Sequence, residues 1–214
     1  ELKLILIDEL PQAAPLVQHS LAALLGPDHR LGSLQFNPAN TYFMATGNSQ
    51  ADGAGVRQIF THLGNRLSIL SLSVSFDDWL VWARGNNVSP HVVGYLSFQR
   101  SSLWDFDARR PTNATPRAWE RVSDIVQRPV FASLSSAVQF ATIASIVGEG
   151  PGAAFAGFLS GLSRVVESYH IDRIRQDPEN YPVPASSDLQ TAYMIAVYLA
   201  QVHSPPPGDT TAEL

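Results

Sequence analysis

Short apolar runs and stretches of helical periodicity alternate near the start of the chain. Residues 4–7 are uninterrupted Leu-Ile-Leu-Ile, which predicts a parallel strand covered on both faces. Residues 42–46 and 67–72 predict a second and a third strand. Apolar side chains recur every three or four positions over residues 14–25, and residues 53–63 are weakly helical. This alternation predicts an α/β unit with a parallel sheet and crossover helices.

The pattern changes at residue 76, after which helices follow one another with little strand. Asp77 and Asp78 lie in a predicted first turn, where the helix dipole favours acids. Ser89-Pro90 and Thr115-Pro116 each combine a capping residue with a first-turn proline. Further helices are predicted over residues 134–147, 153–169 and 189–202, with the glycines at 148, 150 and 152 separating the first two.

These patterns divide the chain into four parts. Residues 1–75 form the α/β part, residues 76–128 a helical lid and residues 129–203 a C-terminal helical region. Residues 204–214, rich in proline and threonine, form a flexible tail. The predicted fold class is therefore α/β, a partial parallel-sheet core followed by an all-helical lid and C-terminal helices.

Composition narrows the classes of partner and compartment. The net charge of −5 disfavours a nucleic-acid coat or a binder of anionic membranes. The sequence has no cysteine, which excludes disulfides, thiolate nucleophiles and cysteine-based metal sites, and we expect a cytoplasmic location. No apolar run approaches the roughly 20 residues that span a bilayer. Glu1 stands directly before a strand, and we interpret this start as a truncation or processing point.

Two acids, Asp8 and Glu9, end the first apolar strand. Ligands of open parallel sheets bind beyond the carboxyl ends of the strands. Asp8 is there placed to bind Mg²⁺ directly or through water, and Glu9 to act on an attacking water as a general base. The alternative is a buried strand that stops at two solvated acids.

Two more candidates follow the second strand and precede the third. The amide of Asn48 can donate and accept, so it could position a water and contact a γ-phosphate; the alternative is a turn asparagine beside Gly47. Arg66 could reach the nucleotide of a neighbouring subunit as an arginine finger. Its alternative is a surface arginine in an ordinary ion pair.

A last candidate, Arg117, opens the helix that follows Thr115-Pro116. The helix dipole disfavours a cation at this end, so an anionic partner is expected. A bound γ-phosphate is one such partner. A neighbouring carboxylate, Glu120 or Asp124, is the other.

The order of these features resembles the AAA+ ATPases downstream of their Walker A loop, and the MoxR-like branch in particular. The resemblance is carried by residues 4–10, Met44-Ala45-Thr46-Gly47-Asn48, residues 65–67 and Thr115-Pro116-Arg117-Ala118-Trp119-Glu120, and it covers most of the chain up to Val126. It implies a partial AAA+ αβα core. It also implies the roles of the candidate residues: Asp8 and Glu9 as the Walker B pair with Asp8 on Mg²⁺, Asn48 as sensor 1, Arg66 as arginine finger and Arg117 as sensor 2.

The same resemblance implies cofactors and partners. ATP and Mg²⁺ are the expected cofactors. ATP hydrolysis is expected to drive remodelling or maturation of a protein partner, such as a von Willebrand factor A-type protein. The expected assembly is a homo-oligomeric ring, commonly a hexamer.

The sequence lacks one motif of the family, and nucleotide binding is expected to be weaker for this reason. The phosphate loop, Gly-x-x-x-x-Gly-Lys followed by Ser or Thr, occurs nowhere in the 214 residues. The glycine cluster at 148–152 has no Lys-Ser/Thr after it and follows no strand. This chain alone is therefore expected to bind ATP weakly or not at all. Two other functions stay open: a non-catalytic assembly module derived from an AAA+ protein, and a nucleic-acid remodeller such as a helicase loader.

Overall fold

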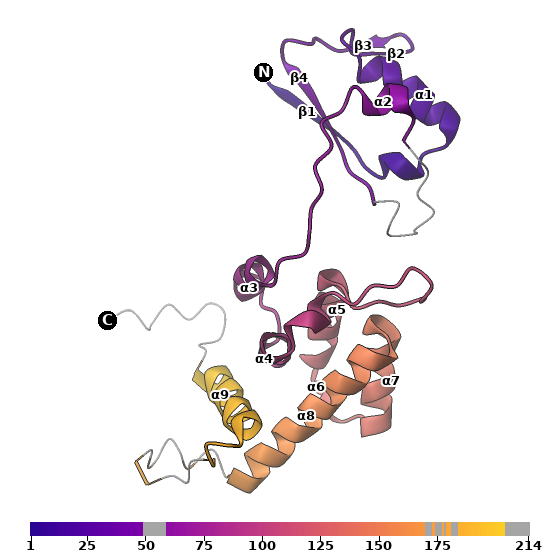
Figure 1. The fold of residues 1–214 in the computed structure, drawn as a ribbon. Coiled ribbons are helices and arrows are strands. Elements are labelled where there is room, and N and C mark those ends of the chain that lie inside the picture. Colours follow the sequence, from indigo (N-terminus) through magenta and orange to yellow (C-terminus); the bar gives the residue numbers. More distant parts are fainter. Residues whose placement is uncertain (49–58, 170–172, 174–176, 178, 181–183, 204–214) are drawn as a thin grey trace. The chain divides into compact units, whose positions relative to one another are not determined.

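The computed structural model describes residues 1–48, 59–169, 173, 177, 179–180 and 184–203, without the side chains of 200–203 (Figure 1). The chain divides into two compact units, the first comprising residues 1–73 and 107–109 and the second the rest of the chain from Val74 on. The division falls two residues before the predicted boundary at 75. The first unit is mixed α/β and the second is helical, as the sequence predicts at this level.

The first unit contains a two-stranded parallel sheet, made by β1 (Lys3–Ile7) and β4 (Thr41–Ala45). Lys3 lies opposite Thr41 and Ile7 opposite Ala45. The segment between these strands contains a short antiparallel hairpin made by β2 (Arg30–Leu31) and β3 (Leu34–Gln35). The remaining described elements of this unit are the 3₁₀ helix η1 (Leu10–Gln12) and the helices α1 (Pro15–Leu24) and α2 (Thr61–Gly64).

Within the described residues of this unit, one face of the sheet is covered and the other is not. Ile7 and Ala45 pack against the buried cluster of Leu10, Ala22 and Leu63, which α1, α2 and η1 supply. The side chains of the opposite face are 55–72% exposed: Leu2, Leu4, Leu6, Tyr42 and Met44. We call this surface the open sheet face. The prediction that β1 is covered on both faces is therefore wrong in the described structure, because no second layer packs on it there.

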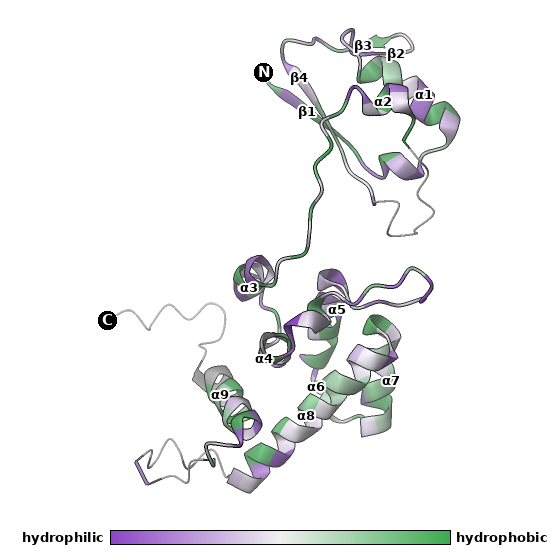
Figure 2. Ribbon diagram, in the orientation of Figure 1, coloured by the Kyte–Doolittle hydropathy of each residue, from purple (hydrophilic) through white to green (hydrophobic). Residues whose placement is uncertain are grey.

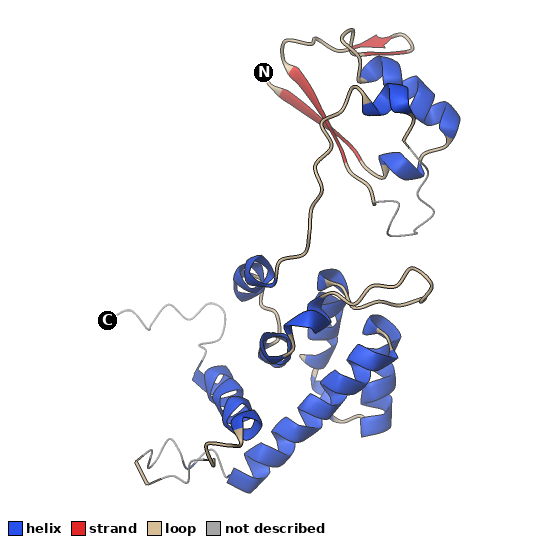
Figure 3. Cartoon of the chain, in the orientation of Figure 1, coloured by secondary structure: helices blue, strands red, loops and turns tan. Residues whose placement is uncertain are grey.

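The predicted third strand is also wrong in the part of the chain that the structure describes. Residues 67–72 are extended but pair with no strand, and Figure 3 draws them as a loop. A strand exists only where a neighbouring strand accepts and donates its ladder hydrogen bonds. Ile69, Leu70 and Leu72 are consequently 69–98% exposed, and the segment is largely apolar in Figure 2. Of the predicted helix over residues 53–63, α2 occupies the end, whereas residues 53–58 lie outside the described residues.

The second unit consists of helices, and the predicted start at Ser89-Pro90 is present, although the Ser89 side chain forms no capping hydrogen bond. The Ser75 Oγ atom accepts a hydrogen bond from the Asp78 amide at 3.3 Å, and the Thr115 Oγ1 atom accepts one from the Ala118 amide at 3.2 Å. The predicted tail, residues 204–214, lies outside the described residues. The helices have these bounds: α3 Phe76–Gly85, α4 Pro90–Phe98, η3 Arg100–Leu103, α5 Pro116–Val126, α6 Pro129–Ala132, α7 Ser136–Val147, α8 Glu149–Tyr169 and α9 Leu189–His203.

These helices enclose one aromatic core. Trp119 on α5 lies 5.5 Å from Phe155 on α8 and 5.5 Å from Tyr95 on α4, measured between ring centroids. The Trp119 Nε1–H donates to the carbonyl of Ser102 at 2.7 Å, so the indole is buried without losing its hydrogen bond. Residues 76–128 and 129–203 thus share a single core. No helix within the described ranges has the length and apolarity to cross a bilayer.

The glycines between α7 and α8 differ in their roles. Gly148, with φ of +90°, separates the two helices. Gly150 and Gly152, predicted as part of the separator, lie inside α8 instead. The reason is close packing: a Cβ atom on Gly152 would lie 2.7 Å from the Cα atom of Ala144.

Substituting two glycines of α8 tests this helix contact. Gly152→Ala is expected to lower the free energy of unfolding by about 1–3 kcal/mol, because the backbone of α7 must shift. Gly157→Ala has nothing within 4 Å of its new Cβ and is expected to raise stability by about 0.5–1 kcal/mol through helix propensity. Urea unfolding of both variants measures the difference. Equal stabilities would contradict the contact.

Candidate functional site

The carboxyl ends of β1 and β4 meet at one edge of the sheet. The ladder continues past the strands, because the Thr46 amide donates to the Ile7 carbonyl at 2.9 Å and the Leu10 amide donates to the Thr46 carbonyl at 3.0 Å. This register sets Asp8 and Glu9 beside the segment from Thr46 to Asn48. The structure thus brings the predicted residues Asp8, Glu9 and Asn48 to the same edge, all three exposed to solvent.

The carboxylate of Asp8 accepts hydrogen bonds from two groups of the described residues. Its Oδ1 atom accepts from the Glu9 amide at 3.1 Å and from the Thr46 hydroxyl. Thr46 is a residue of the site that sequence reasoning missed. No sequence signal marks it, because its place beside Asp8 depends on the register of β1 and β4, which a Thr46–Ile7 hydrogen bond continues past the last pair, Ile7 and Ala45.

The backbone turns sharply at Glu9. Its φ and ψ of 57° and 35° are left-handed, a conformation that costs a non-glycine residue about 1–2 kcal/mol. The turn leads directly into η1 and leaves the Glu9 carboxylate exposed next to Asp8. Such backbone outliers concentrate at functional sites, which supports a role for this acid.

Close packing holds the end of β4 against η1. A Cβ atom on Gly47 would lie 2.1 Å from the Cδ atom and 2.6 Å from the Cγ atom of Pro11. Only glycine permits this approach. Gly47 is therefore a packing residue of the strand edge, and Asn48 directly follows it.

Gly47→Ala tests the packing of this edge. The new methyl group must push β4 away from Pro11, so we expect a loss of about 1–3 kcal/mol in the free energy of unfolding of the first unit. Gly64→Ala is the matched control, since a Cβ there meets nothing within 4 Å, and it is expected to change stability by less than about 0.5 kcal/mol. Thermal unfolding measures both. Unchanged stability of Gly47→Ala would refute the close approach.

Arg66 follows α2 in the same unit and is exposed. Its Nη1 atom donates to the carbonyl of His62 at 2.8 Å. Among the described residues, its guanidinium forms no ion pair, so the ordinary surface ion pair weighed from the sequence is not present there. No contact in that part of the chain joins Arg66 to Asp8, Glu9 or Asn48.

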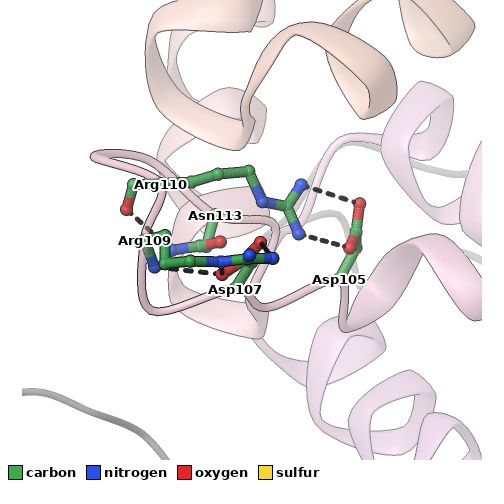
Figure 4. Close-up of polar contacts among 5 residues, drawn as sticks. All are labelled: Asp105, Asp107, Arg109, Arg110 and Asn113. Atoms are coloured by element: carbon green, nitrogen blue, oxygen red, sulfur yellow. Dashed lines mark hydrogen bonds and ion pairs between the residues drawn. The ribbon is translucent and has the colours of Figure 1, made fainter.

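Arg117 belongs to the second unit, in the first turn of α5, and is exposed. Within the described ranges it pairs with neither Glu120 nor Asp124. The loop before this helix is held by Asp105, whose carboxylate accepts two hydrogen bonds from Arg110 at 2.7 and 3.2 Å (Figure 4). The Asp105 amide also donates to the Ala114 carbonyl at 3.0 Å, next to the cap of α5. The turn that carries Arg117 is therefore firmly anchored.

The donor set at the sheet edge suits one kind of metal. No group of three or more His, Asp or Glu side chains in the described part of the chain could hold an ion. Asp8 and Glu9 offer two carboxylates only. Mg²⁺ is commonly bound through one or two carboxylates together with substrate phosphates and water. The edge therefore fits Mg²⁺ delivered with a nucleotide better than a free ion.

No protein-family description, curated protein or solved structure matches this chain. The function of the edge is therefore inferred from its residues and its geometry.

Proposed function

We propose that this chain is the Walker B half of an AAA+ ATPase of the MoxR-like kind, which uses ATP hydrolysis to remodel a protein partner. One observation carries the proposal: parallel pairing of β1 with β4 brings an Asp-Glu pair and an asparagine to the same strand edge. That is the edge where ligands of parallel sheets bind. The pairing brings together two segments that are far apart in the sequence, Asp8-Glu9 and Asn48.

Each residue has a separate task in this mechanism. Asp8 binds Mg²⁺, which when bound neutralises charge on the phosphates. Glu9 accepts the proton of the attacking water, and the amide of Asn48 orients that water beside the γ-phosphate. Arg66 serves the site of the neighbouring subunit in a homo-oligomeric ring. Arg117, which belongs to the second unit, has the sensor 2 role only through the resemblance.

The open sheet face supports the proposal independently. Five large apolar side chains on one sheet face form a surface of the kind that parallel sheets cover with a helical layer. The extended segment 67–72 likewise exposes apolar side chains and lacks a strand beside it within the described residues. In the proposed enzyme, the part of the module that contains the phosphate loop covers the face and pairs with the segment.

A second function, a non-catalytic assembly module derived from an AAA+ protein, is the alternative. The two functions differ in the sequence that precedes Glu1 in the gene. An in-frame Gly-x-x-x-x-Gly-Lys-Ser/Thr there supports the ATPase. A start codon close to Glu1 supports the assembly module.

Calorimetric titration with ATP tests the proposal. The chain of 214 residues is expected to show no binding at micromolar concentrations, because it lacks the amides and lysine that hold the phosphates. The protein extended through the phosphate loop is expected to bind ATP, and Asp8→Ala should remove the effect of Mg²⁺ on that binding. Equal ATP affinity with and without the loop would contradict the proposed division of the site.

A further inference from the structure

We propose that Thr46 is a positioning residue that holds the carboxylate of Asp8 ready for the metal; this inference rests on the proposed function. The Thr46 hydroxyl and the Glu9 amide both donate to the Oδ1 atom of Asp8. Among the described residues, the Oδ2 atom of Asp8 accepts no hydrogen bond. One oxygen is thus engaged by the protein, and the other is available to a ligand.

The side chain and the backbone of Thr46 form hydrogen bonds with different partners. The Thr46 amide and carbonyl are both used in the extended ladder, bonded to Ile7 and Leu10. The side chain itself is exposed. Replacing it by valine therefore removes the donor while the ladder, the strand and the buried cluster keep their contacts.

Holding the carboxylate of Asp8 in one orientation favours the binding of Mg²⁺ in particular. Mg²⁺ requires near-ideal octahedral geometry and gives up its waters reluctantly. An exposed aspartate that rotates freely must be ordered when the metal binds, which weakens binding. A hydrogen bond to an ionised carboxylate is stronger than one between neutral groups, so the Thr46 hydroxyl is well suited to impose this order in advance.

The test uses the protein extended through the phosphate loop, with Mn²⁺ as a spectroscopic substitute for Mg²⁺. Electron paramagnetic resonance measures Mn²⁺ binding in the presence of a non-hydrolysable ATP analogue. Thr46→Val is expected to raise the Mn²⁺ dissociation constant about 5- to 20-fold, in line with losing one charge-assisted hydrogen bond. Thr46→Ser retains the hydroxyl and is expected to bind Mn²⁺ as the wild type does.

If the role of Thr46 were purely structural, its substitution would change the thermal unfolding temperature or the binding of the analogue without metal. Binding of the analogue without metal, and the thermal unfolding temperature, are expected to stay unchanged in both variants, because the side chain is exposed. Wild-type Mn²⁺ affinity in Thr46→Val, or equal weakening in Thr46→Ser, would overturn the role of Thr46 and leave the proposed ATPase intact. If the wild-type protein binds no Mn²⁺ with the analogue, the proposed function and this inference both fail.

Discussion

Two inactive variants, Arg66→Ala and Glu9→Gln, are expected to regain ATP hydrolysis when their subunits are mixed in one ring. Arg66 is exposed at the end of α2 and forms no ion pair with the described residues, so its guanidinium remains available to a neighbouring subunit. Loss of an arginine finger lowers turnover about 10³- to 10⁵-fold. In mixed rings, an intact Glu9 in one subunit meets an intact Arg66 in the next.

The expected recovery has a defined size. With random mixing in equal amounts, about one interface in four combines the two intact residues, so turnover should reach about a quarter of the wild-type rate. ATP hydrolysis at increasing mixing ratios measures it. Arg84→Ala, which removes another exposed arginine from the end of α3, is the control and should hydrolyse ATP normally. Mixed rings without recovery, or an active Arg66→Ala variant, would contradict action in trans.

Local signals sufficed for many elements of the fold. Thr115-Pro116 predicts the start of α5, and the Thr115 hydroxyl caps it in the structure. Acids at Asp77 and Asp78 mark the first turn of α3 in the same way. These signals succeed because a helix start is determined by residues within one turn of it.

Features that depend on distant partners could not be predicted. Residues 67–72 have the composition of a strand, but pairing with another strand determines whether one forms. The apolar run Leu4–Ile7 shows that β1 can be buried on two faces. It does not show that a second layer packs there, and Leu4 and Leu6 are exposed. From the sequence, Gly152 is predicted to separate two helices. In the structure it lies inside α8, where it packs closely against Ala144 of α7.

The residues of the candidate site also differ in whether the sequence could predict them. Asp8, Glu9 and Asn48 were predicted because each follows an apolar strand. Thr46 and Gly47 were missed, because their importance comes from the register of β4 against β1 and from the contact with Pro11. The sequence motif therefore predicted Asp8, Glu9 and Asn48 as candidates, whereas only the packed structure showed the contacts of Thr46 and Gly47.

Glu9→Gln has the second large expected effect. Glutamine keeps the size of the side chain and its ability to hydrogen-bond, but it cannot accept the proton of the attacking water. Turnover is expected to fall about 10²- to 10⁴-fold, the usual contribution of a general base. In the protein extended through the phosphate loop, ATP binding should persist, because Asp8 and that loop are unchanged. Glu167→Gln, an exposed acid on α8, is the matched control and should leave the rate unaltered.

The most direct measurement follows ATP turnover and retained ATP together in the Glu9→Gln protein that carries the phosphate loop. If the edge formed by β1 and β4 is the catalytic half of an ATPase site, hydrolysis is lost and unhydrolysed ATP remains bound to each subunit. Wild-type turnover in this variant would show that Glu9 is not the base and would contradict the proposed function of the edge.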